Sequence, residues 1–199
     1  MGVRTLFHSF MEIAQVIHPT GANLDGYGSS IRNLLILACT EFEATAKSVL
    51  RENGYQRNKT NIEDYNKLEQ AMRLSQYKVE LQDFPEIGAL QPFREWGSKQ
   101  SLAWYKAYNN AKHDRHLNFS KASLRHALDA LLGNYVLMVA SYGWQRVREN
   151  LVSIPVRPKV CEFPVWELGE MYRRAEFAVG SLIEAREIQT PIKYSFGER

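Results

Sequence analysis

Cysteine and long apolar runs are both scarce in this chain, and each scarcity excludes a class of protein. Cys39 and Cys161 are the only two cysteines among the 199 residues, and they lie far apart in the sequence. They form neither a disulfide framework nor a paired-cysteine zinc motif, so a reducing compartment, the cytoplasm, is expected. The longest apolar stretch, residues 127–144, contains Asp129 and Asn134. Polar residues at these positions predict a buried core helix instead of a membrane span.

The N-terminal segment and the missing catalytic motifs narrow the function classes further. Apolar residues such as Leu6, Phe7 and Phe10 recur at helical spacing and are interrupted by polar residues, which predicts an amphipathic helix and not a signal peptide. The sequence has no glycine-rich phosphate loop and no nucleophile elbow. Glu41 and Glu43 do not share one helix face, so a paired-carboxylate hydrolase is not expected. We therefore expect no cofactor.

Apolar residues make up 45% of the sequence, which suffices for a full core, and most of them recur at helical spacing. Capping residues and turn formers divide this periodicity into predicted helices. They are a first helix ending near His18, a long helix from Ser29 or Ser30 to about Asn53 with Gly54 as its stop, a short helix opened by Thr60 and Glu63, a helix from Ser101 to about Asp114, a core helix from Lys121 to Arg148 capped by Asn118 or Ser120, and a helix from Trp166 to Ala178.

Other stretches depart from the helical period. Residues 78–84 alternate apolar and polar side chains, which predicts a short strand or extended edge. Residues 153–164 contain three prolines among β-branched residues, so they are expected to be extended but not a central strand. Residues 188–196 resemble an extended tail, and Phe93 and Trp96 are expected to pack onto the helices. The predicted fold is mainly α, with a short extended or β addition from the C-terminal third.

Titratable side chains concentrate in one segment, WYKAYNNAKHDRH at residues 104–116. Between Trp104 and His126 the cations are Lys106, Lys112, Arg115, Lys121 and Arg125, against Asp114 alone. This balance of +4 leaves −1 of the formal net charge of +3 for the rest of the chain. Such a concentration favours an anionic partner such as RNA, and the alternative is a solvated helix face with ordinary lysines.

The order of the predicted helices resembles the HEPN superfamily of small helical-bundle proteins. The resemblance lies in the helix IRNLLILACTEFEATAK and in the run WYKAYNNAKHDR before a final apolar helix, and it spans roughly residues 29–150. It implies an HEPN-like helical bundle that forms a homodimer, in a family prevalent among prokaryotic defence and toxin–antitoxin ribonucleases. It divides the chain into an N-terminal amphipathic helix and loop (1–28), the bundle (29–150) and a C-terminal extension packed on it (151–199).

The sequence departs from the superfamily in one respect. Ribonucleases of this superfamily carry an arginine, then four to six residues, then a histidine. His113 fills the histidine position, but the residue with six others between it and His113 is Lys106, and the closer positions hold Ala107 and Tyr108. Arg115 follows the histidine instead of preceding it. Either Lys106 or Arg115 supplies the cation by a different geometry, or the nuclease activity has been lost.

The residue types still suit metal-independent RNA cleavage. Histidine titrates near neutrality and can both take the proton of a 2′-hydroxyl and protonate a leaving oxygen, while cations stabilise charge on the phosphorane. The catalytic candidates are His113, Arg115, Lys112 and Lys106. The candidates for substrate binding are Asn109 and Asn110 on the phosphate or imidazole, Tyr108 as a stacking surface beside Trp104, and His116.

Each of these residues also has a structural interpretation. Trp104, Tyr105 and Tyr108 recur at core spacing, and His113 can bond a loop carbonyl at a helix end. His113 and His116 are three apart without a third ligand, so no metal is expected.

Two functions from different classes follow. The first is an RNA-directed protein, either a metal-independent endoribonuclease of a bacterial defence or toxin–antitoxin type or an inactive relative that binds RNA. The second is a non-catalytic, dimerising interaction module of a defence or mobile-element locus, which docks on a protein partner or antitoxin. No membrane partner is expected in either case.

Overall fold

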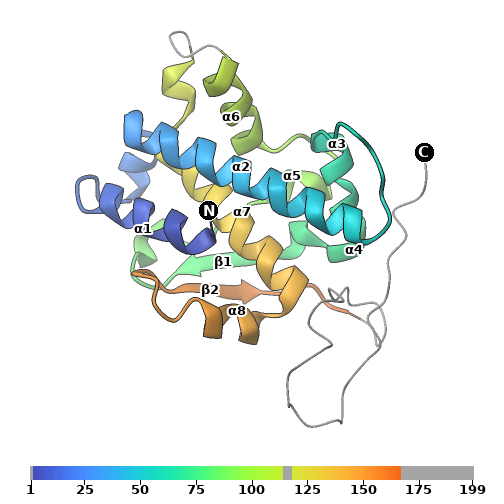
Figure 1. Cartoon of the computed structure of the whole chain (residues 1–199). Helices are drawn as coiled ribbons and strands as arrows, with labels where there is room; N and C mark the ends of the chain where they lie inside the picture. Colours follow the sequence, from blue (N-terminus) through green and yellow to red (C-terminus); the bar gives the residue numbers. More distant parts are fainter. Residues whose placement is uncertain (1, 114–117, 167–199) are drawn as a thin grey trace.

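The computed structural model describes residues 2–113 and 118–166, which form a mainly helical structure with a small antiparallel sheet (Figure 1). The predicted fold class is therefore confirmed. The longer helices are α1 (Val3–Ala14), α2 (Ser29–Glu52), α6 (Ala103–His113) and α7 (Leu124–Tyr142). The shorter elements are η1 (Gly21–Asp25), α3 (Ile62–Tyr65), α4 (Lys67–Met72), η2 (Leu74–Gln76), β1 (Lys78–Leu81), η3 (Pro85–Ile87), α5 (Arg94–Gly97), η4 (Phe119–Lys121), α8 (Trp144–Asn150) and β2 (Pro158–Glu162).

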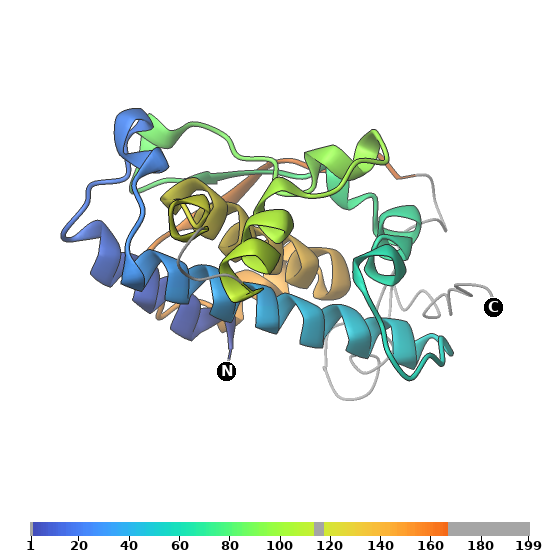
Figure 2. The ribbon, with the colours of Figure 1, turned by 90° about the horizontal axis from the view of Figure 1, so that it is seen from above.

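The centre of the fold is α7, which carries the longest apolar stretch of the sequence. It lies between α2 and the two-stranded sheet (Figure 2), so apolar residues are buried on nearly all of its sides. Asn134, 2% exposed, donates from Nδ2 to the carbonyl of Ala38 in α2 at 2.8 Å. On the sheet side, the Tyr135 hydroxyl donates to the carbonyl of Pro158 at 3.2 Å. None of the helices within the described ranges combines the length and hydropathy of a membrane span.

The N-terminal helix belongs to the same core. Leu6, Phe7 and Phe10 are fully buried, and α1 packs against both α2 and α7. Its helical part ends at Ala14, earlier than the predicted end near His18, because the next residues close a turn. In this turn the Ile17 N–H donates to the carbonyl of Ile13 at 2.8 Å.

An aromatic cluster joins α2, α5 and α6. Phe42, Phe93, Trp96 and Trp104 are at most 3% exposed, and their ring centroids lie 4.9 to 6.2 Å apart in the contacting pairs. The Trp104 indole N–H donates to the carbonyl of Pro92 at 2.7 Å, which satisfies its one polar group. The predicted packing of Phe93 and Trp96 onto the helices is confirmed.

The two predicted extended segments pair with each other. β1 and β2 run antiparallel, with Val79 and Leu81 turned into the core. Val79 also exchanges backbone hydrogen bonds with Leu90 on the other side of β1, so among the described residues β2 is an edge strand. Proline cannot donate to a sheet, which explains why Pro158 occupies the first position of this edge strand.

Several predicted helix ends differ by a few residues. The N-cap of α2 is Gly28, without a side-chain hydrogen bond, and not Ser29 or Ser30. The stop at Gly54 is confirmed, since this glycine has a φ of 86° directly after the C-cap Asn53.

The last core helix starts later than predicted and is interrupted. Its N-cap is Ser123, whose Oγ accepts from the His126 N–H, and not Asn118 or Ser120. Gly143, with a φ of 82°, ends α7 at Tyr142 and separates it from α8. The helix predicted from Trp166 and the tail at 188–196 lie outside the described residues, apart from Trp166 itself.

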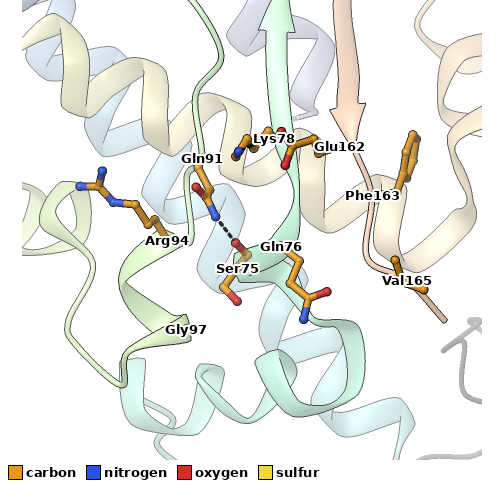
Figure 3. A pocket seen from close by; sticks show the side chains of 9 residues that line it. All are labelled: Ser75, Gln76, Lys78, Gln91, Arg94, Gly97, Glu162, Phe163 and Val165. Carbon is orange, nitrogen blue, oxygen red and sulfur yellow. Dashed lines mark hydrogen bonds and ion pairs between the residues drawn. The ribbon is translucent and has the colours of Figure 1, made fainter.

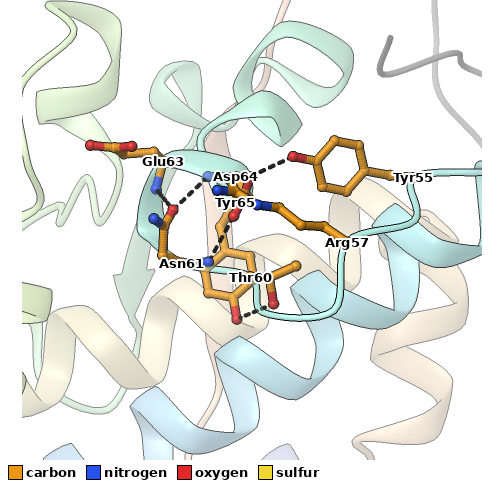
Figure 4. Close-up of polar contacts among 7 residues, drawn as sticks. All are labelled: Tyr55, Arg57, Thr60, Asn61, Glu63, Asp64 and Tyr65. Atoms are coloured by element: carbon orange, nitrogen blue, oxygen red, sulfur yellow. Dashed lines mark hydrogen bonds and ion pairs between the residues drawn. The ribbon is translucent and has the colours of Figure 1, made fainter. Parts of the chain in front are cut away.

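The start of α3 is held by Asn61 and Asp64, not by Thr60 and Glu63 as predicted. Asn61 and Asp64 form a reciprocal capping box, one residue further along the chain. Asp64, 2% exposed, also accepts from the Tyr55 hydroxyl at 2.5 Å and from Arg57 Nη1 at 2.8 Å (Figure 4). Burial alone raises the pKa of Asp64, but these hydrogen bonds outweigh it and lower the pKa.

Candidate functional site

Two hydrogen bonds far apart in sequence hold α6 on α2. The Tyr105 hydroxyl donates to Glu43 Oε1 at 2.6 Å, and Arg32 Nη2 donates to the carbonyl of Ala111 at 2.7 Å. The first contact joins the middle of α2 to the start of α6, and the second joins the first turn of α2 to the end of α6. In Figures 1 and 2, α6 crosses α2 at a steep angle, and the C-terminal end of α6 lies at the top of Figure 1.

One face of α6 is exposed along its length. Lys106, Asn110 and His113 are all exposed, and their spacings of four and three residues place them on consecutive turns of one face. The closer positions before His113 are Ala107, 4% exposed, and Tyr108, 2% exposed. Lys106 and His113 thus share one exposed face of α6.

Lys112 belongs to a different side of the helix. Its Nζ donates to the Tyr108 hydroxyl at 3.1 Å and lies 5.2 Å from the centre of that ring. The hydrogen bond with Tyr108 raises the pKa of Lys112, and the charge of Glu43 adds to the effect. Asn109 is half-buried between this side and the exposed face. The structure therefore brings Lys106, Asn110 and His113 together and turns Lys112 away from them.

The buried aromatic rings of α6 are not stacking surfaces. Trp104 is 1% exposed and Tyr108 is 2% exposed, so neither can receive a base without unpacking the core. The expected stacking role of Tyr108 does not fit its position, and the core interpretation of these rings is correct. Trp104 and Tyr108 are four residues apart on α6, so both rings lie on the side of the helix that faces the core.

Two predicted site residues, Arg115 and His116, lie outside the described residues, as does Asp114. Within residues 2–113 and 118–166, the structure has no group of three or more His, Cys, Asp or Glu side chains placed to hold a metal ion.

Three features of this end of the molecule were not predicted from the sequence. Arg32 reaches the end of α6, and its Nε is buried without a hydrogen-bond partner among the described residues. Glu43 binds Tyr105, and burial together with this carboxylate raises the pKa of the Tyr105 hydroxyl. Tyr27, 55% exposed, contacts Phe119. Each joins segments between 62 and 92 residues apart, so no local sequence pattern indicates it.

A cavity of about 480 Å³ lies elsewhere, between η2, α5 and the two strands (Figure 3). Several of its polar groups already bind one another. Lys78 Nζ lies 2.9 Å from Glu162 Oε1, and Gln91 Nε2 donates to the carbonyl of Ser75 at 2.5 Å. None of its lining residues comes from α6. The cavity is therefore separate from the α6 face.

Comparison with family models, curated proteins and solved structures yields no match to this chain. The functional interpretation consequently depends on the geometry of α6 and its surroundings.

Proposed function

We propose that this chain is an RNA-directed, HEPN-like protein that acts as a metal-independent endoribonuclease of a bacterial defence or toxin–antitoxin type. His113 is the acid/base group and Lys106 is the cation. The observation that carries the proposal is the exposed face of α6, on which Lys106, Asn110 and His113 lie on consecutive turns. A single-stranded RNA backbone can reach all three side chains without any rearrangement of the core.

The reaction needs two proton transfers. An unprotonated imidazole takes the proton of the 2′-hydroxyl as its oxygen attacks the adjacent phosphorus, and a protonated imidazole gives a proton to the departing 5′-oxygen. A homodimer that apposes two α6 faces supplies one His113 for each role. Lys106 stabilises the charge on the non-bridging oxygens, and the Asn110 amide donates to one of them.

The cation at this site is a lysine, which has a kinetic consequence. Lysine binds phosphate as a point charge and lacks the two parallel donors of arginine. We therefore expect cleavage to be slow and strongly dependent on salt.

The test incubates the purified chain with end-labelled single-stranded RNA in EDTA. Wild-type protein is expected to cut, His113→Ala to abolish cutting, and Lys106→Ala to slow it by about 100-fold or more, the size typical of losing one charge-stabilising group. His8→Ala is the matched control, because His8 is an exposed histidine on α1. Cutting that survives in His113→Ala, or that is lost equally in His8→Ala, contradicts the proposal.

A second candidate is a non-catalytic, dimerising interaction module that docks on a protein partner or antitoxin. It is favoured by the lack of an arginine at the superfamily's spacing before His113, where Lys106 is the one basic residue and Ala107 and Tyr108 are buried. Absence of both cutting and salt-dependent RNA retention by wild-type protein supports this candidate.

A further inference from the structure

An exposed aromatic pair lies near the C-terminal end of α6. Tyr27 is 55% exposed, an unusual exposure for a large aromatic side chain. Its ring meets that of Phe119 edge to face, with centroids 5.9 Å apart and an interplanar angle of 90°. With this contact in place, more than half of the Tyr27 residue remains open to solvent.

The backbone around Tyr27 is fastened to the start of α7. The Leu124 N–H donates to the carbonyl of Gly26 at 2.8 Å, and Tyr27 forms an isolated antiparallel bridge with Ser123. Tyr27 is thus presented by a fixed segment, and little conformational entropy is lost when a ligand packs on it.

Basic residues lie close in sequence to both members of this aromatic pair. Phe119 begins η4, which packs against α6, and η4 ends at the exposed Lys121. Arg125 is exposed in the first turn of α7, while Arg32 lies in the first turn of α2 and bonds the carbonyl of Ala111 near the end of α6. Asp25, two residues before Tyr27, is an exposed acid, so the cations outnumber it. An exposed aromatic side chain in a basic segment is complementary to a strand that carries both bases and phosphates.

We propose that Tyr27, supported by Phe119, is the surface on which a nucleobase of single-stranded RNA stacks while the adjoining backbone lies along the Lys106–His113 face. This inference rests on the proposed RNA-directed function. It also assigns the base-stacking role to a residue outside α6, since Trp104 and Tyr108 are buried. Every base has a flat π-face, so we expect stacking on Tyr27 without strong sequence preference.

The test measures the affinity of the full chain for two fluorescent oligoribonucleotides of equal length, one with normal bases and one with abasic sites throughout. Wild-type protein is expected to bind the base-bearing strand at least about five-fold more tightly, the lower end of the effect of one stacked base. Tyr27→Leu should lose that preference, while Tyr27→Phe should keep it because the ring is retained. Trp144→Leu on α8 is the control, since Trp144 is also exposed, at 44%.

The outcomes separate this inference from the function on which it rests. If wild-type protein binds RNA through Lys106 but Tyr27→Leu keeps the full preference for bases, the stacking role is wrong and the RNA-directed function stands. If Tyr27→Leu weakens both strands equally, or if wild-type protein shows no preference, the stacking role is also wrong. If wild-type protein binds neither strand, both proposals fail, and a protein partner becomes the better occupant of this surface.

Discussion

At the scale of single residues, the position of α6 depends on polar contacts at its border with α2. Glu43 and Arg32 reach across from α2, and each contacts a group of α6 that lies beneath the exposed face. The core supplies most of the packing energy, but apolar contacts are not directional, whereas a hydrogen bond to a carboxylate fixes one geometry. The orientation of the Lys106–His113 face therefore depends on a small number of side chains.

The Tyr105–Glu43 hydrogen bond can be removed without changing the shape of the ring. Tyr105→Phe is expected to lower the free energy of unfolding by about 1–2 kcal/mol, because the half-buried carboxylate loses a donor that water replaces only in part. Urea denaturation measures the change. The control is Tyr77→Phe, because the Tyr77 ring is also buried and its hydroxyl has no hydrogen bond within the described parts of the chain. An equal loss in both variants would mean that the Glu43 contact adds nothing.

Asp129 gives the folded chain a titration near neutral pH. Burial raises the pKa of Asp129 to about 7, with a lowering contribution from Arg125 and a raising one from Glu95. The carboxyl of an unfolded chain has a pKa of about 4, so between about pH 4 and 7 the folded protein holds a proton that the unfolded chain has released. Asp129 therefore lowers the free energy of unfolding as the pH rises through this window.

Asp129→Asn is expected to remove this dependence because the amide does not titrate. The variant should match wild-type protein near pH 4 and exceed it by about 1–2 kcal/mol at pH 8, a value discounted for the partial exposure of the group. Thermal unfolding of both proteins across this range measures the difference. A difference that does not change with pH would show that Asp129 is not the group that titrates.

At the scale of elements, the sequence predicted which segments are helical more accurately than where they begin. The apolar stripes of α2 and α7 were evident because burial repeats with the helical period. The N-caps of the helices were not evident from the sequence, because several neighbouring residues can accept hydrogen bonds from the first N–H groups of a helix. Asn61 is chosen over Thr60, whose Oγ1 instead lies 3.0 Å from the Tyr65 hydroxyl. Side-chain contacts of this kind decide between neighbouring capping residues that the sequence alone does not distinguish.

The start of α7 allows a direct test of the cap. Ser123→Ala is expected to lower the free energy of unfolding by about 1 kcal/mol, because Ser123 Oγ accepts from the His126 N–H and lies 3.2 Å from the His126 ring. Ser120→Ala, at an exposed position proposed from the sequence as the cap, should change it by less than about 0.5 kcal/mol. Chemical denaturation of the two variants measures both values. A larger loss of unfolding free energy in Ser120→Ala than in Ser123→Ala would mean that Ser120 is the N-cap and that the helix starts earlier.

At the scale of the whole molecule, long-range pairings build the surface that the sequence could not foresee. The polar residues of α6 were predicted as candidates, and three of them, Lys106, Asn110 and His113, share an exposed face. What the sequence did not reveal is that Lys112 turns toward Tyr108, that Arg32 reaches α6, and that Tyr27 is presented beside Phe119. These contacts depend on how α2, α6 and α7 pack, and that packing is not encoded in any single segment.

The uneven distribution of charge over the molecule leads to a prediction about salt. Residues 104–126 carry a balance of +4 and the rest of the chain −1, so RNA contacts should concentrate at the α6 end and not spread over the surface. Each phosphate contact on a single strand adds about 0.7 to the slope of log affinity against log salt concentration. Lys106→Ala is therefore expected to reduce that slope by about 0.7, and Lys159→Ala to leave it unchanged.

Lys159 is a matched control because it is an exposed lysine on β2, on the other side of α7 from α2 and away from α6 (Figure 1). The slopes come from fluorescence anisotropy titrations of one oligoribonucleotide at several salt concentrations. If both substitutions reduce the slope equally, RNA is held by diffuse attraction to any lysine, and the α6 face has no special role. If Lys106→Ala alone reduces it, the phosphate contact lies within reach of His113, as the cleavage mechanism requires.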